Sequence, residues 1–171
     1  QAVTMPPDLD DEAFENAIAS VDVSLNLRWP TAGETSGPWV QALAAGRATV
    51  TIDHAHQAHV PALDPQNFRP RRGTRGEAPV TVAIDILDED HSLRLAMLRL
   101  AQDERLRASL GAAGRRYWER EHTVTRMVDD YERLIRIAHE QPDPPPLAAA
   151  LLRPDASSHV RRLTRAFGDL P

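Results

Sequence analysis

The sequence predicts an α/β fold in which helices cover both faces of a parallel sheet in three layers, followed by further helices toward the carboxyl terminus. Strand, helix and strand patterns follow one another between residues 21 and 52, an order typical of parallel sheets. Three amphipathic helical patterns then come in close succession between residues 93 and 138. The 171 residues suffice for one core with an appendage.

Composition narrows the functional classes. The chain is 42% hydrophobic and 26% charged, as in soluble globular proteins, and no apolar run approaches the ~20 residues of a membrane span. The absence of cysteine excludes disulfides and thiolate metal sites and fits a cytoplasmic location. The net charge of −5 and the scattered basic residues argue against nucleic acid as a partner.

The two ends of the chain carry little chemistry. The amino terminus lacks both an initiating Met and a signal peptide pattern, so we expect the chain to start inside a longer protein. We predict one domain over residues 1–140 and a proline-rich linker with a short helical tail over 141–171. Two apolar segments of that tail, 147–152 and 160–167, are too short to form a core and are expected to pack onto this domain or another one.

The periodicity of apolar residues predicts the order of elements in the first half. A helix started by Asp8 or Asp10 is followed by strand, helix, strand, loop and a last strand. The predicted ranges are helix 11–20, strand 21–27, helix 38–45, strand 47–52, loop 53–77 and strand 79–84.

The stretch from Arg28 to Thr51 is the strongest candidate for a ligand site. Pro38 is favoured at the first position of a helix, which makes Ser36 or Gly37 the N-cap. The free N–H groups at such a helix start suit a phosphate. The alternative is that Thr35 and Ser36 simply cap the helix. Because the loop follows a strand, it lies where open α/β sheets bind ligands.

Three further polar clusters leave their roles open. His54, His56 and His59 alternate on a chain expected to be extended, and they can bond locally, contact a ligand or hold a metal. The cluster of Arg69, Arg71, Arg72 and Arg75 is either solvated or lines a groove for an anion. The carboxylates of Asp85, Asp88, Glu89 and Asp90 precede a helix, so we assign them to capping rather than to a cation.

Three helices are predicted in the carboxyl-terminal part. Asp103 starts the second and Thr123 caps the third. Gly111 and Gly114 lie inside the second helix, where no strand precedes them, and are interpreted as close-packing positions. The three apolar stripes are Leu93, Ala96, Met97 and Leu100; Leu106, Leu110, Ala113 and Tyr117; and Val124, Met127, Val128, Tyr131, Leu134, Ile135 and Ala138.

The order of several motifs resembles the carboxyl-terminal half of a family 4, or group 1, glycosyltransferase. The motifs are residues 21–23 leading into a loop, 33–37 (GETSG), 41–47 (QALAAGR) and 110–115 (LGAAGR), followed by Tyr131. The resemblance covers residues 3–138 and implies a Rossmann-like domain, one half of a GT-B fold.

The resemblance also implies a ligand and a site. In that family the helix start meets the diphosphate of a nucleoside-diphosphate sugar such as a UDP- or GDP-sugar, and acidic residues contact the sugar and the ribose. Alignment places Gly33 and Gln41 where two Glu residues are usual, with Glu34 one position late. The residues carried over are Arg28, Gly33, Glu34, Thr35, Ser36, Gly37 and Gln41, with Glu34 in the catalytic role.

The expected function is therefore donor binding in a glycosyltransferase of bacterial polysaccharide or glycoconjugate biosynthesis. Family members that retain anomeric configuration typically work without a metal or other cofactor. The acceptor-binding amino-terminal lobe would precede Gln1, so this chain is expected to be inactive alone. Peripheral membrane contact through the full-length enzyme stays open. The alternatives are a nucleotide- or phosphate-binding module without catalysis, and an interaction domain.

Overall fold

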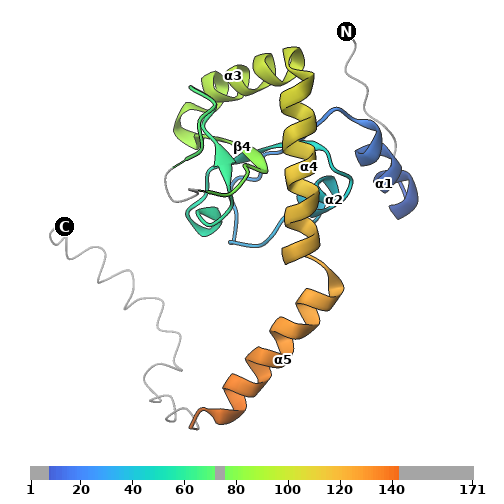
Figure 1. Cartoon of the computed structure of the whole chain (residues 1–171), viewed down its shortest axis with the longest axis vertical. Helices are drawn as coiled ribbons and strands as arrows, with labels where there is room; N and C mark the ends of the chain where they lie inside the picture. The colour runs from blue at the N-terminus through green and yellow to red at the C-terminus, as the bar shows by residue number, and fades with distance from the viewer. Residues whose placement is uncertain (1–7, 72–75, 143–171) are drawn as a thin grey trace, which may run out of the picture. The chain divides into compact units, whose positions relative to one another are not determined.

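A computed structural model describes residues 8–71 and 76–142 of the chain. The predicted tail segments 147–152 and 160–167, together with Arg72 and Arg75, lie outside these residues. Figure 1 shows the arrangement. The helices are α1 (Asp11–Ser20), α2 (Gly37–Ala44), α3 (Glu89–Gln102), α4 (Glu104–Glu121) and α5 (Val124–Glu140); the strands are β1 (Val23–Asn26), β2 (Ala48–Ile52), β3 (Ala62–Leu63) and β4 (Thr81–Ile84); two 3-10 turns are η1 (Ala55–Gln57) and η2 (Ile86–Asp88).

The strands form one parallel sheet in the order β1-β2-β4-β3. Every residue of β2 and of β4 is buried, as expected for inner strands covered on both faces. The predicted α/β class, with a Rossmann-like parallel sheet and carboxyl-terminal helices, is confirmed. Each predicted long element is present within about three residues of its predicted ends.

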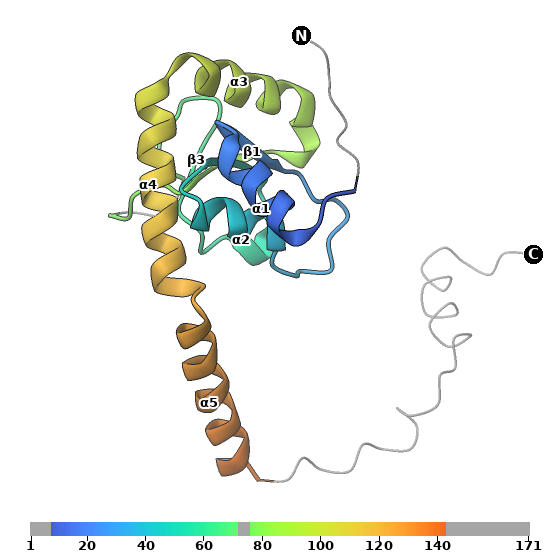
Figure 2. The ribbon, with the colours of Figure 1, turned by 90° about the vertical axis from the view of Figure 1, so that its right-hand side faces the viewer.

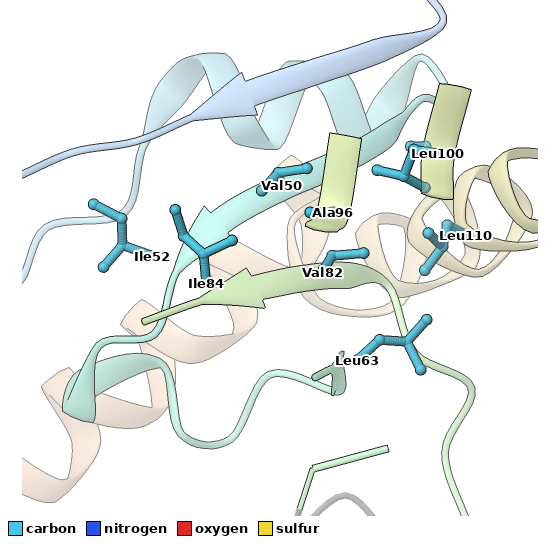
Figure 3. Close-up of a cluster of buried hydrophobic side chains, with 9 residues drawn as sticks. Val50, Ile52, Leu63, Val82, Ile84, Ala96, Leu100 and Leu110 are labelled. Carbon is cyan, nitrogen blue, oxygen red and sulfur yellow. The ribbon is translucent and has the colours of Figure 1, made fainter. Parts of the chain in front are cut away.

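The two sheet faces pack against different helices. On one face, Val50, Ile52, Val82 and Ile84 join side chains of α3 and α4 in the larger apolar cluster, as Figure 3 shows. Side chains alternate between the two faces along a strand. The residues between the apolar ones therefore present their hydroxyl groups on the opposite face. There the indole Nε1 of Trp39 in α2 donates to the Thr49 hydroxyl at 3.3 Å. The sheet is thus covered by α3 and α4 on one face and by α2 on the other.

A close contact between α2 and α4 fixes this arrangement, and Figure 2 shows both helices beside the sheet. A β-carbon on Gly111 would lie 2.1 Å from the carbonyl oxygen of Gly46. One on Gly114 would lie 2.9 Å from Cδ2 of Leu43. Gly46 itself ends the α2 turn with φ +65, a conformation that favours glycine. The prediction of close packing at 111 and 114 is confirmed, and the helix ends close to the end of its predicted range, 38–45.

Side-chain caps also stand where the sequence places them. Asp10 accepts a hydrogen bond from Ala13 N at 2.8 Å, Asp103 from Leu106 N at 2.9 Å, and Thr123 Oγ1 from Arg126 N at 3.2 Å. Asp85 caps η2 by accepting from Leu87 N at 2.9 Å. The structural role assigned to the acidic run after β4 therefore has direct support at Asp85.

The prediction of an unbroken loop over residues 53–77 is wrong. The segment contains η1 and the short strand β3. β3 pairs with the edge of β4 through Ala62 and Leu63, and two residues are too few to give a readable alternation. The 3-10 turn also replaces the extended chain that was expected to put the histidines on one side.

Helix α5 is strongly amphipathic, yet none of its residues is buried. The chain divides into two compact units, Gln1–Tyr131 and Glu132–Pro171, and the division falls within this helix. Its apolar side chains are between 44% and 72% exposed, in contrast to the buried stripe of α4. The exposed apolar residues are Val124, Met127, Val128, Tyr131, Leu134, Ile135 and Ile137.

Candidate functional site

The start of α2 lies in the loop that follows β1, at the carboxyl edge of the sheet. Ser36 is the N-cap residue, with φ −75 and ψ 117, and Pro38 occupies the first turn. The Ser36 side chain makes no capping hydrogen bond. The residue as a whole is 7% exposed, but its hydroxyl is not among the buried polar atoms that lack a partner in the described residues. Of the two residues predicted as N-cap, Ser36 and Gly37, it is Ser36 that holds this position, without a side-chain capping bond.

A narrow cleft opens beside this helix start. Its walls come from Ser36 and Trp39 of α2, from Arg28 and Glu34 of the preceding loop, and from His56. The cleft has a free volume of only about 10 Å³, less than a phosphate needs. A ligand group can reach Ser36 only if the loop moves or if it enters from a neighbouring space.

Glu34 is folded back onto its own loop. Its Oε2 accepts hydrogen bonds from Ala32 N at 2.8 Å and from Thr31 Oγ1 at 3.1 Å, and its Oε1 lies 2.9 Å from a guanidinium nitrogen of Arg28. Hydrogen bonds from its own backbone N–H, from Thr31 and from Ala32, with a smaller effect of the Arg28 charge, lower the pKa of Glu34. The side chain is therefore a carboxylate near neutral pH, and both Glu34 and Arg28 brace the loop.

Gly33 has a backbone conformation that favours glycine. Its φ is +89, in the left-handed region where a side chain is strained. Glu at 33 would carry that strain, whereas Glu34 does not have a positive φ. Thr35 and Gly37 are exposed next to the helix start. Gln41, one turn into α2, does not line the cleft.

The histidines after β2 stack instead of alternating. The rings of His54 and His56 are 5.2 Å apart at 16°, and Trp29 stacks on His54 at 5.8 Å. The Nε2–H of His54 donates to the carbonyl of Arg28 at 2.9 Å. This bond ties the segment after β2 to the loop after β1. His54 thus has a local structural role, and both His54 and His56 border the cleft.

A second cavity adjoins the first and shares Trp39, His56 and Gln57 with it. We call it the histidine groove; its volume is about 260 Å³. It adds Gly33 and Thr35 of the loop, His59 and Val60, and Tyr117 and His122 from the end of α4. No carboxylate lines it among the described residues.

His122 was not a candidate from sequence. Its Nε2 is buried and has no hydrogen-bond partner in the part of the chain that the structure describes. Burial lowers the pKa of His122, and the nearby Glu121 opposes that shift. Its ring packs edge-on against Trp39 at 6.0 Å and against Tyr117 at 5.5 Å. No local pattern brings residue 122 to residue 39, so only the fold reveals this wall.

Another cavity, of about 390 Å³, lies beside β2 and β4. Thr51, Thr81 and Asp53 line it, together with Arg71. Arg71 forms a salt bridge with Asp53, and its Nη1 donates a hydrogen bond to the carbonyl of Ala83 at 3.0 Å. Within the predicted basic cluster, Arg71 is thus a brace between strand ends rather than a solvated charge.

Comparisons with known proteins leave the chain without an assigned relative. No family model, curated protein or solved structure matches it. In residues 8–71 and 76–142, no three side chains of the metal-binding types are grouped so that they could hold an ion. No helix in the described ranges is long and apolar enough to cross a membrane.

Proposed function

We propose that this chain is the donor-binding part of a glycosyltransferase and that the start of α2 binds a phosphate of a nucleoside-diphosphate sugar. The observation that carries the proposal is the start of α2, where the N-cap residue Ser36 makes no side-chain capping hydrogen bond and its hydroxyl is left available to a ligand. The first amides of a helix have no acceptor within the helix, and a phosphate oxygen would accept from them and from the Ser36 hydroxyl. The location after a parallel strand supports the same interpretation.

Each carried-over residue has a part in this proposal. The Ser36 hydroxyl and the Gly37 amide donate to the phosphate, and Thr35 adds a hydroxyl at its exposed side. Arg28 offers a cation once Glu34 releases it. Gln41 would meet the ribose with one amide, and Glu34 would turn toward the donor sugar. Gly33 provides the turn that presents them.

The binding step needs a rearrangement, because the cleft at Ser36 is nearly filled. A ligand phosphate that draws Arg28 away from Glu34 would open it, since both anions compete for that cation. The donor is a UDP- or GDP-sugar, with no metal required. The acceptor and the remaining cations would come from an amino-terminal lobe, and transfer would be cytoplasmic.

Titration calorimetry tests the binding. We expect UDP or GDP to release heat with this chain, and we expect about tenfold weaker binding for Ser36→Ala, the effect of losing a hydrogen bond to a charged group. Ser36→Pro removes the hydroxyl and the N–H of residue 36 and should weaken binding at least as much. Ser109→Ala, an exposed serine of α4, is the matched control. Absence of heat with every nucleotide would contradict the proposal.

A second candidate, a nucleotide-binding module without catalysis, is favoured by the bonded state of Glu34 and by the distance of Gln41 from the cleft lining. The two candidates differ in the use of the sugar. If Glu34 contacts the donor sugar, Glu34→Gln should weaken UDP-sugar binding while UDP binding stays within about twofold. Equal affinities of UDP and UDP-sugar for both proteins would favour the module.

A further inference from the structure

Helix α5 carries an apolar face that nothing in the described residues covers. Val128, Tyr131, Leu134 and Ile135 belong to this face, which extends around the helix from Leu134 to Val128. None of the residues of α5 is buried. In the compact unit Glu132–Pro171, Leu134 and Ile135 are 56% and 67% exposed. Contiguous apolar surface of this kind marks an interaction site, so this end of α5 is expected to have a partner.

The charged side chains of α5 are distributed unevenly around this face. A helix turns by about 100° per residue, so Asp130 and Glu132 fall about 40° beyond its two edges. The three arginines of the helix fall about 80° or more beyond those edges; they are Arg126, Arg133 and Arg136. An apolar face bordered by carboxylates is complementary to an apolar partner that carries basic side chains.

Residues 160–167 (VRRLTRAF) have this complementary composition. Val160, Leu163 and Phe167 are spaced by three and four residues, which predicts an amphipathic helical segment. The same eight positions include three arginines and no carboxylate. The segment lies outside the described residues, and its sequence carries this expectation. A segment this short cannot form a core of its own, so its apolar side chains are expected to pack on another surface.

The connection between α5 and this segment is long enough for the chain to return. Nineteen residues, 141–159, separate them, and an extended chain spans up to ~3.3 Å per residue, or about 60 Å. Along α5, Glu132 and Glu140 are only about 12 Å apart. Five of the nineteen residues are prolines, which disfavour a continuous helix. The other apolar segment, 147–152, follows the run of prolines directly and has no charged residue, so it matches the carboxylates less well.

We propose that residues 160–167 fold back onto the carboxyl-terminal half of α5 and cover its apolar face at Leu134 and Ile135, with their arginines beside Glu132. The occupant of the face is thus a segment of the same chain, and the contact lies within the unit Glu132–Pro171. Apolar burial stabilises the contact, and the opposite charges select the segment and its register. The inference is independent of the proposed function, because neither the start of α2 nor a ligand takes part in it.

Hydrogen exchange of the full chain tests the contact. We expect the amides of residues 134–140 to exchange about tenfold faster or more in Leu163→Asp/Phe167→Asp than in the wild type, because this end of α5 loses the surface that protects it. Leu151→Asp/Leu152→Asp, in the other apolar segment, is the matched control and should stay within about twofold of the wild type. Equal exchange in Leu163→Asp/Phe167→Asp and the wild type overturns the inference, and so does an effect of equal size in the control. Protection that rises with protein concentration in both proteins would assign the face to a second copy and would also overturn it.

The absence of cysteine from the chain allows a second test with one engineered disulfide. In Leu134→Cys/Leu163→Cys, both thiols belong to the proposed contact. In Arg133→Cys/Leu163→Cys, one thiol lies on the far side of α5, and the sequence separation is nearly the same, so loop closure costs the same. We expect the disulfide within one chain to form about tenfold faster in the first variant, with the difference lost in concentrated urea. Equal rates without urea, or disulfides mainly between two chains, overturn the inference.

Discussion

The two ends of α2 differ in almost every physical respect. At the carboxyl end, Gly46 meets the backbone of α4 at Gly111, and Arg115 of α4 donates to the carbonyl of Ala44. At the amino end, Ser36 has no side-chain partner, and the preceding loop is exposed and bonded mainly to itself. One helix thus has one end fixed by backbone contact and one end with unsatisfied donors.

This difference separates positioning from binding. The α4 contact fixes where α2 lies against β2, and so fixes where its first amides point. The open end leaves those amides available to a ligand. The start of a helix without a side-chain cap suits an anion, so the better-exposed end of this fixed helix is where a ligand would bind.

The largest expected effect comes from adding a methyl group where α4 contacts the carboxyl end of α2. Gly111→Ala places a methyl group 2.1 Å from the Gly46 carbonyl oxygen, and two backbones have to separate. Such overpacking costs ~1–3 kcal/mol or more, partly offset by the higher helix propensity of Ala. We expect a net loss of about 3 kcal/mol in the free energy of unfolding, measured by urea titration. Ala112→Ser, on the exposed side of α4, should stay within about 0.5 kcal/mol. A Gly111→Ala protein as stable as wild type would show that the contact is loose.

The next effect is smaller because the obstacle is a side chain. Gly114→Ala brings its methyl group 2.9 Å from Cδ2 of Leu43, which can rotate or shift by a fraction of an ångström. We expect a loss of about 1 kcal/mol in the same urea titration. A loss as large as that of Gly111→Ala would mean that Leu43 cannot move. The rigid contact between α2 and α4 would then extend from Gly111 to Gly114.

The two glycines also show what the sequence allows one to predict. A glycine pair inside a helical pattern has few explanations, and close packing was the correct one. The apolar stripe of α5, by contrast, predicts a helix correctly but does not reveal what covers it. Leu110 of α4 is 2% exposed and Leu134 of α5 is 56% exposed, although both lie on regular stripes. Periodicity encodes the helix, while burial depends on a partner surface.

The candidate site likewise has features that the sequence predicts and features that depend on the tertiary fold. The helix start and Ser36 follow from local signals, namely Pro38 and a polar loop after a strand. The self-bonded state of Glu34 depends on the exact path of residues 31–34 and has no signal in periodicity. The wall formed by His122 joins residues 39, 117 and 122 through the tertiary fold, so no local pattern could indicate it. The sequence indicates a histidine cluster that includes residues 54 and 56, but the stacking of these two rings depends on a 3-10 turn that is too short to predict.

A third effect distinguishes a binding role of Ser36 from a capping role. Replacing an N-cap serine by alanine usually costs ~0.5–2 kcal/mol. Because the Ser36 side chain makes no capping bond, we expect Ser36→Ala to change the free energy of unfolding by less than about 0.5 kcal/mol. Thr123→Ala is the comparison, since Thr123 does accept from Arg126 N; its effect is read as helix content by circular dichroism. A loss of ~1 kcal/mol or more for Ser36→Ala would return this serine to the scaffold and weaken its assignment to a ligand.

The smallest effect concerns how the open end is held when no ligand is bound. Hydrogen bonds lower the pKa of Glu34, and the Arg28 charge contributes least of the named causes. Because the folded pKa lies below the ordinary value of 4.5, the loop bonds contribute fully above that pH and are lost as the pH falls through the lowered value. In a carboxyl-carbon NMR titration, we expect Thr31→Val to raise the pKa of Glu34 more than Arg28→Gln does. The opposite order would mean that the ion pair, not the turn, closes the loop, and a ligand phosphate could then open it by attracting Arg28 alone.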